Sequence, residues 1–173
     1  HVTHDFGEAI SLASRVGVMH NGRIIQEGTP DEVFTHPANR FVARYAGIKN
    51  FFRVTFVRSY NCCSCITDNR TKFKLPKGDY PSSGLLIIAA TEVLLSRQGA
   101  AGVQINNIHG VIEDIVPSPL GYEITINAGD HFYADITRRE MDEEKYVTGE
   151  PVIISFRPES LKMVGEGEEM NKY

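Results

Sequence analysis

The sequence has no long apolar run and no export signal in its first residues. Its most apolar stretch, 85–95, is broken by Thr91 and Glu92, whereas a membrane-spanning helix needs about 18 or more consecutive apolar residues. The first four residues lack the charged and then apolar pattern of a signal peptide. We therefore expect a cytoplasmic chain that reaches a membrane only through a partner.

Cysteine is scarce, and Cys62, Cys63 and Cys65 are crowded into four positions. An odd number at this spacing is not a disulfide framework, which indicates a reducing compartment. A closed zinc site usually takes four ligands, often as two separated pairs, and no second pair exists here. His109 and His131 are distant candidates that no spacing selects, so we expect no metal site and interpret the run as a strand or turn with partly buried thiols. A metal-binding barrel is the alternative.

The motif Gly-x-x-x-x-Gly-Lys-Ser/Thr is absent from the whole sequence. Its backbone amides wrap the phosphates of a nucleotide and its lysine neutralises them. Phosphoryl transfer depends on positioning and charge stabilisation of this kind. The chain by itself is therefore expected not to hydrolyse ATP.

Charge is distributed unevenly around a net value of −4. Residues 48–98 hold eight Lys and Arg against three Asp and Glu, and residues 99–173 hold six against fourteen. The basic segment suits an anionic ligand, while the acidic half argues against nucleic acid as a partner. Two differently solvated surfaces are the alternative explanation.

Two local signals mark the first 47 residues. Asn21-Gly22 lies between apolar runs and predicts a hairpin, because both turn residues must accept positive φ. Thr29-Pro30-Asp31-Glu32 predicts a helix start: Thr29 caps the amide of Glu32, Glu32 reaches back, and Pro30 takes the first helical position. Further upstream, Thr3-His4-Asp5 precedes a helix expected from near Phe6, which Thr3 or Asp5 could cap.

In this order, these motifs resemble the C-terminal end of an importer-type ABC ATPase domain, over residues 1 to about 47. The resemblance implies that the intact enzyme uses ATP and Mg²⁺ and that His4 contacts the γ-phosphate of ATP. An imidazole suits this role because it can donate a hydrogen bond to phosphate at neutral pH. The family's Leu-Ser-Gly-Gly-Gln signature and its strand ending in Asp-Glu are also missing. We therefore expect a C-terminal piece of a longer ATPase; an ordinary helix cap is the alternative for the triplet alone.

After Gly47 the pattern changes to short strands separated by turn residues, with one helix at 138–145. Many short strands at this spacing predict small closed barrels. The expected strands are 51–57, 63–67, 71–75, 85–90, 93–95, 108–116, 122–127, 131–136, 152–156 and 161–164. Two echoes suggest an internal repeat: 50–54 with 107–111, and 90–94 with 157–161.

These two groups of strands resemble the regulatory region of importer ATPases, built from oligonucleotide-binding-like (OB-like) folds of the TOBE and Mop type. The predicted fold is mainly β, with two OB-like five-stranded β-barrel modules after a short α/β remnant of an ABC ATPase domain. The expected domains are 1–47 for the remnant, 48–100 and 101–165 for the modules, and 166–173 for a disordered tail. Such a region implies a regulatory homodimer, attached to the permease subunits at the inner face of the membrane.

The second module is similar to the oxyanion-binding modules of molybdate and tungstate importer ATPases. The resemblance makes Asn106, Thr137 and Arg138 candidate donors to molybdate or tungstate. A dianion needs several donors when it is desolvated. Glu140 stands where that group has serine, and a carboxylate beside an anion would repel it. A stand-alone oxyanion-binding protein, a purely structural dimerising barrel, or an importer ATPase for sugar, polyamine, iron or sulfate are the alternatives.

Overall fold

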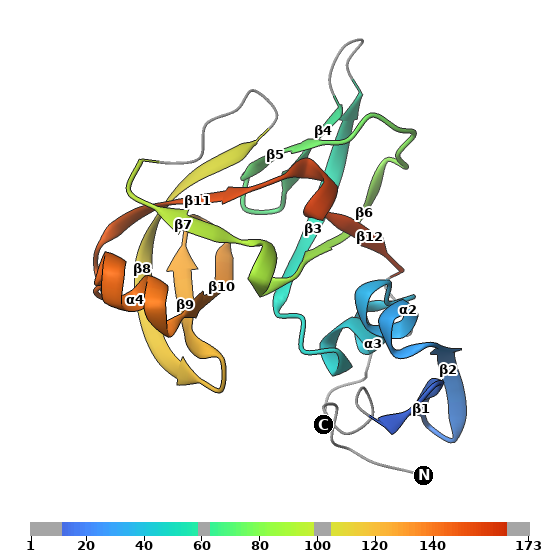
Figure 1. Ribbon diagram of the computed structural model, residues 1–173. Helices are drawn as coiled ribbons and strands as arrows, with labels where there is room; N and C mark the ends of the chain where they lie inside the picture. Colours follow the sequence, from blue (N-terminus) through green and yellow to red (C-terminus); the bar gives the residue numbers. More distant parts are fainter. Residues whose placement is uncertain (1–11, 59–62, 99–104, 166–173) are drawn as a thin grey trace. The chain divides into compact units, whose positions relative to one another are not determined.

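The computed structural model describes residues 12–58, 63–98 and 105–165 (Figure 1). Its described residues form two compact units: residues up to Ile48 together with those from Val164, and Lys49–Met163, called the β-module below. His4, the helix expected from near Phe6, Cys62 and the tail from 166 lie outside the described residues. No helix among the described residues is long and apolar enough to cross a membrane.

The first unit begins with the predicted hairpin. Strand β1 (Val16–His20) pairs antiparallel with β2 (Arg23–Gly28). Between them, Asn21 has φ 47° and Gly22 has φ 74°, the positive values that this two-residue turn requires. The structure therefore confirms the turn expected from the Asn-Gly pair.

Two short helices follow, α2 (Pro30–Thr35) and α3 (Arg40–Tyr45). The predicted capping box is present: the Glu32 amide donates to Thr29 Oγ1 at 3.2 Å, and the Thr29 amide donates to Glu32 Oε2 at 2.8 Å. These bonds hold the pKa of Glu32 below its usual value. Val33 on α2 and Val42 on α3 are fully buried, so both helices have an apolar face in the core of this unit.

The β-module consists mainly of two five-stranded sheets, in the orders β12-β6-β3-β4-β5 and β7-β11-β8-β9-β10. The first sheet contains β3 (Asn50–Arg58), β4 (Cys63–Thr67), β5 (Lys72–Leu75), β6 (Ser83–Ile88) and β12 (Lys162–Val164). The second contains β7 (Leu94–Ser96), β8 (Asn106–Ser118), β9 (Gly121–Asn127), β10 (His131–Thr137) and β11 (Pro151–Phe156). The helix α4 (Arg138–Glu144) follows β10. This mainly β architecture after a short α/β segment confirms the predicted fold class.

Each sheet takes its outermost short strand from the other half of the module (Figure 1). Strand β7 precedes β8 in sequence but pairs with β11, and β12 is the neighbour of β6. The sheets therefore do not follow a division of the chain near residue 100, because each half supplies one strand to the other.

The two halves repeat the same order of strands, and α4 is an addition in the second half. A 3-10 turn, η1 (Ala90–Glu92), follows β6, and η2 (Pro158–Ser160) follows β11. Asn50 at the start of β3 pairs with Ile88, and Asn106 at the start of β8 pairs with Phe156. The structure thus aligns Asn50 with Asn106, one residue away from the echo with Asn107 read in the sequence. In a strand, one residue of shift exchanges the two faces.

One hydrophobic core serves both sheets. Phe52 and Phe73 from the first sheet contact Phe132 and Phe156 from the second, with ring centroids 4.8 Å apart for Phe52–Phe132 and 5.6 Å for Phe73–Phe156. All four rings are at most 2% exposed. Because this core is continuous, the two sheets form one compact unit.

Candidate functional site

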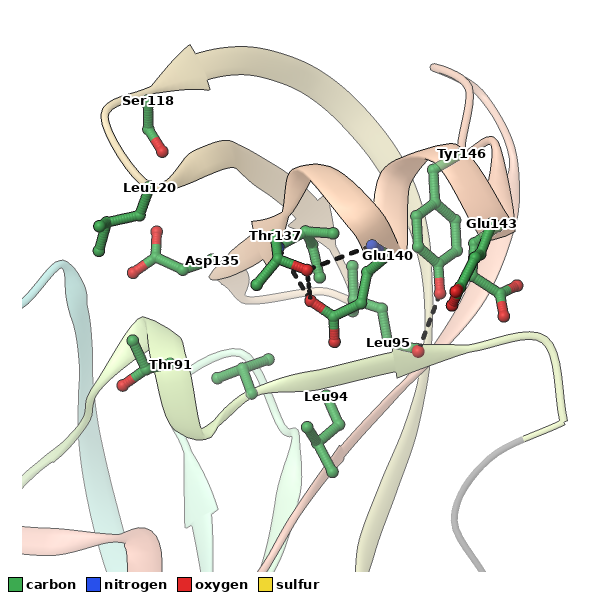
Figure 2. A pocket seen from close by; sticks show the side chains of 13 residues that line it. Thr91, Leu94, Leu95, Ser118, Leu120, Asp135, Thr137, Glu140, Glu143 and Tyr146 are labelled. Carbon is green, nitrogen blue, oxygen red and sulfur yellow. Dashed lines mark hydrogen bonds between the residues drawn. The ribbon is translucent and has the colours of Figure 1, made fainter.

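A cavity of about 360 Å³ lies beside α4 (Figure 2). Its lining comes from η1 and β7, the turn between β8 and β9, the end of β10, and α4 with the residues that follow it. Leu94, Leu95 and Ile136 supply apolar surface. Tyr146 is 5% exposed and donates its hydroxyl to the Leu95 carbonyl at 2.9 Å, which fixes one end of this wall.

The polar wall begins where α4 starts. Thr137 is the N-cap of the helix, and its hydroxyl accepts from the Glu140 amide at 3.2 Å. Glu140 Oε2 in turn lies 2.6 Å from Thr137 Oγ1 and accepts from the Thr137 amide at 2.9 Å. Figure 2 shows these two side chains directed at each other. The bonds from Thr137 lower the pKa of Glu140, so its carboxylate is charged at neutral pH.

Asp135 projects from β10 on the other side of the cavity, toward Leu120 in Figure 2. Burial raises the pKa of Asp135, and the charge of Glu123, its cross-strand partner, raises it further. Lys49 opposes this effect. Its Nζ donates to both carboxylate oxygens of Glu123 at 2.7 Å, so it neutralises the neighbour of Asp135.

Arg97, just after β7, holds the far end of α4. Its guanidinium donates to Glu144 Oε2 at 2.7 Å, to the Glu144 carbonyl at 2.8 Å and to Glu150 Oε1 at 2.6 Å. The ring of Tyr146 lies 5.3 Å from the guanidinium carbon. The hydrogen bond to Glu150 is the main reason that the pKa of Arg97 is raised. Arg97 therefore positions the helix that carries the acidic wall.

Four carboxylates line this cavity, and none of its described lining residues is Lys, Arg or His. The four are Asp135, Glu140, Glu143 and Glu144. Arg139 pairs with Glu143 at 2.8 Å and Arg97 with Glu144, but both guanidiniums bind from outside the lining. Because opposite charge favours a bound ion and like charge repels it, the wall suits a cationic group better than an anion.

Asn106, a predicted donor, is 3% exposed and does not line the cavity. Its Oδ1 accepts from the Lys74 amide at 2.7 Å, and its Nδ2 donates to the Lys74 carbonyl at 3.2 Å. Asn50 makes the corresponding pair with Tyr133, at 2.7 Å and 2.9 Å. Each asparagine thus bonds the backbone of a strand in the opposite sheet, where a buried amide needs a partner.

The other two predicted donors lie side by side at the start of α4. Thr137 lines the cavity, but its hydroxyl and amide are bonded to Glu140. Arg138 is exposed and is not a lining residue. The structure therefore brings one of the three donors to the cavity. His4 lies outside the described residues.

The cavity also depends on residues that the sequence did not single out, Asp135 and Arg97. The acidic side chains of 140–144 were visible as a cluster in a helix. Asp135 and Arg97 gave no local signal, because Asp135 is one polar position of an alternating strand and Arg97 reaches α4 over 47 residues of sequence. The only hint was the positive charge of Arg97 just after β7, which could have suggested an acidic partner distant in sequence.

Cys63 and Cys65 lie on β4, as the strand interpretation predicted. Cys63 is half-buried and its sulfur lies 3.6 Å from the Gly78 carbonyl. Cys65 is fully buried, and burial raises its pKa to about 12. In the described part of the chain, no group of three or more His, Cys, Asp and Glu side chains could hold a metal ion.

Comparison with known sequences identifies relatives over most of the chain. The sequence is 30% identical to the molybdate/tungstate import ATP-binding protein WtpC of Pyrococcus abyssi, over 94% of this chain and 46% of WtpC. It is 27% identical to the spermidine/putrescine import ATP-binding protein PotA of Aster yellows witches'-broom phytoplasma, over 94% of this chain and 36% of PotA. The chain thus spans less than half the length of these relatives. No family model matches it.

A solved structure shares the fold. The cytoplasmic molybdate-binding protein ModG, in a form with molybdate bound, superposes with a TM-score of 0.57 at 13% identity. The match covers 68% of this chain and 96% of that one. At this identity the likeness concerns the fold alone, and it agrees with the OB-like modules expected from the sequence.

Proposed function

We propose that this chain, a homologue of the ATP-binding subunits of ABC importers over most of its length, is the C-terminal regulatory and dimerisation portion of such a subunit. The observation that carries the proposal is similarity to import ATP-binding proteins over 94% of the chain. That range includes both the α/β segment and the β-module, so the two belong to one functional unit.

The α/β segment is then the end of the nucleotide-binding domain. In the complete subunit, His4 would contact the γ-phosphate of ATP, and residues 12–47 would serve as scaffold. The residues present do not fit ATP and Mg²⁺ on their own, because the sequence has no phosphate-wrapping loop. We therefore expect neither nucleotide hydrolysis nor tight nucleotide binding by this chain alone.

The β-module is the proposed control element, of the TOBE and Mop type. Its two repeats share one hydrophobic core, and we propose that the module pairs with a second copy. The proposed partners are a second ATP-binding subunit and the transmembrane permease subunits. This arrangement puts the protein at the inner face of the cell membrane.

The proposal extends to the class of solute that the importer carries. The names of the relatives point to polyamines for PotA and to molybdate or tungstate for WtpC. The assignment to molybdate or tungstate stays a prediction from sequence. The carboxylate wall favours a cationic solute, so a polyamine importer is the second candidate. Thermal stabilisation by spermidine beyond that of NaCl at equal ionic strength, lost in Glu143→Gln, would support it; equal stabilisation by both would count against it.

The regulatory role is tested by ATP hydrolysis in the complete subunit assembled with its permease. Deletion of residues 49–163 should alter the response of the ATPase rate to solute while leaving nucleotide binding intact. His4→Ala should reduce turnover, with His36→Ala as the matched control because His36 is exposed at the end of α2. Unchanged regulation after the deletion would contradict the role of the β-module, and unchanged turnover would remove His4 from the mechanism.

A further inference from the structure

The fold neighbour binds a tetrahedral oxyanion, and the acidic cavity beside α4 does not fit one. We infer that the β-module excludes molybdate, tungstate and sulfate. The main cause is the carboxylate of Glu140, because it already accepts the hydrogen bonds that an oxyanion would need. This inference rests on the proposed function, since it concerns the ligand class that the control element can read.

The donors that an oxyanion would need are already used. The hydroxyl and amide of Thr137 both lie within hydrogen-bond distance of Glu140 Oε2, at 2.6 Å and 2.9 Å. These are the bonds that an external anion at this place would have to take over. Asn106 is occupied by the amide and carbonyl of Lys74, so turning it toward a ligand would break both of these hydrogen bonds.

The charge of the wall acts in the same direction. Glu143 and Asp135 line the same cavity as Glu140, and a dianion there would meet several negative charges at once. The nearby guanidiniums offset only part of this repulsion. Arg139 pairs with Glu143, and Arg97 with Glu144 and Glu150, but no salt bridge among the described residues joins a cation to Glu140 or Asp135.

The neighbouring cation Arg138 does not neutralise the acidic lining of the cavity. It is exposed and is not among the residues that line the cavity. Desolvation of a doubly charged anion requires several converging donors, and one exposed guanidinium does not supply them. The combination of occupied donors and excess carboxylate therefore disfavours every tetrahedral dianion, not one in particular.

The test uses the complete 173-residue chain and sodium molybdate as the probe, with sulfate as a second dianion. Thermal unfolding and isothermal titration are followed up to millimolar oxyanion, against NaCl at equal ionic strength. We expect no saturable binding and no rise in Tm beyond the salt control. Saturable binding of molybdate to the unaltered chain would overturn the inference.

A pair of variants tests the cause. Glu140→Gln with Glu143→Gln removes two charges from the wall, and glutamine at position 140 can still form the capping box. Asp142→Asn with Glu159→Gln removes two charges from exposed positions outside the cavity. The first pair should show saturable binding of molybdate in the same titration, whereas the second should show none, like the unaltered chain. Equal responses of the two pairs would show that the wall is not the cause.

Circular dichroism of both pairs of variants checks that they are folded. The titration of the unaltered chain tests the inference even if a variant does not fold. Its result does not depend on the ATP hydrolysis measurements proposed for the complete subunit. Oxyanion binding by the unaltered chain would overturn this inference and leave the regulatory role intact. Loss of regulation by the β-module would be seen only in the complete subunit.

Discussion

Asp135 on β10 lies directly opposite Glu123 on β9, so two carboxylates face each other across an antiparallel strand pair. Like charges in this position are destabilising. Lys49 binds both oxygens of Glu123 at 2.7 Å and reduces the conflict. The arrangement keeps a carboxylate at the edge of the cavity at some expense in stability.

Asp135→Asn should therefore stabilise the β-module at neutral pH. A carboxyl whose pKa is raised by folding binds its proton more tightly in the folded chain, so its charged form opposes folding. We expect a gain of about 0.5 kcal/mol in the free energy of unfolding at pH 7. The gain should shrink as the pH falls through the raised pKa and vanish below the ordinary value.

Urea unfolding at pH 7 and near pH 4 measures this difference. Asp142→Asn, on the exposed side of α4, is the control for loss of one negative charge. Lys49→Met should destabilise the chain, and less so when Asp135→Asn is also present, because the residues are coupled. A gain that is the same at both pH values would contradict the assigned cause.

The two buried asparagines should be structural residues of equal weight. Asn106→Ala removes the bonds to the Lys74 amide and carbonyl, and Asn50→Ala removes those to the amide and carbonyl of Tyr133. Each substitution should lower the free energy of unfolding by about 1–3 kcal/mol. Asn127→Ala removes two exposed bonds, one to Glu113 and one from the Gly129 amide, and should cost less. A small effect for Asn106→Ala in chemical denaturation would refute its role in joining the sheets.

Arg97 should control the order of α4. Arg97→Ala removes the bonds to Glu144 and Glu150, and hydrogen exchange of the Lys145 amide, which donates to the Met141 carbonyl at 2.8 Å, should accelerate. Arg139→Ala, whose side chain is 85% exposed and pairs within the helix, serves as the comparison and should change exchange little. Similar acceleration in both variants would mean that Arg97 does not position the helix.

The thiols of β4 should differ sharply in reactivity. The thiolate is the reactive form, and Cys65 is fully buried with a pKa of about 12. In a Cys62→Ser background, a thiol reagent at pH 8 should modify Cys63 and leave Cys65 unmodified until urea unfolds the chain. Mass spectrometry counts the added groups. Rapid labelling of Cys65 in the folded chain would contradict its burial.

Local features of the sequence were enough to predict several elements. The Asn21-Gly22 turn and the Thr29–Glu32 capping box are determined by backbone sterics and by hydrogen bonds within four residues. The strand predicted at 122–127 followed from alternation, because a half-buried strand shows its period in the order of residues, and it is present as β9, Gly121–Asn127. The helix expected at 138–145 is present as α4, Arg138–Glu144.

The order of residues did not reveal which strands become neighbours. Alternation assigns faces to β7 and β12 but contains no information on the sheet that each joins. The register of the repeat was also misjudged by one residue, so Asn107 was aligned with Asn50 where the structure aligns Asn106. Burial decides this register. The side-chain amide of Asn106 is buried and must bond the opposite sheet, whereas that of Asn107 is exposed and need not.

Local chemistry, then, was readable from the chain: turns, caps, strand faces and the family resemblance all depend on residues close together in sequence. The exchanged edge strands, the shared phenylalanine core and the acidic cavity depend on residues brought together from separate segments. Their partners are selected by packing and by the need to pair buried polar groups. Those long-range terms act only once the two sheets have closed on each other.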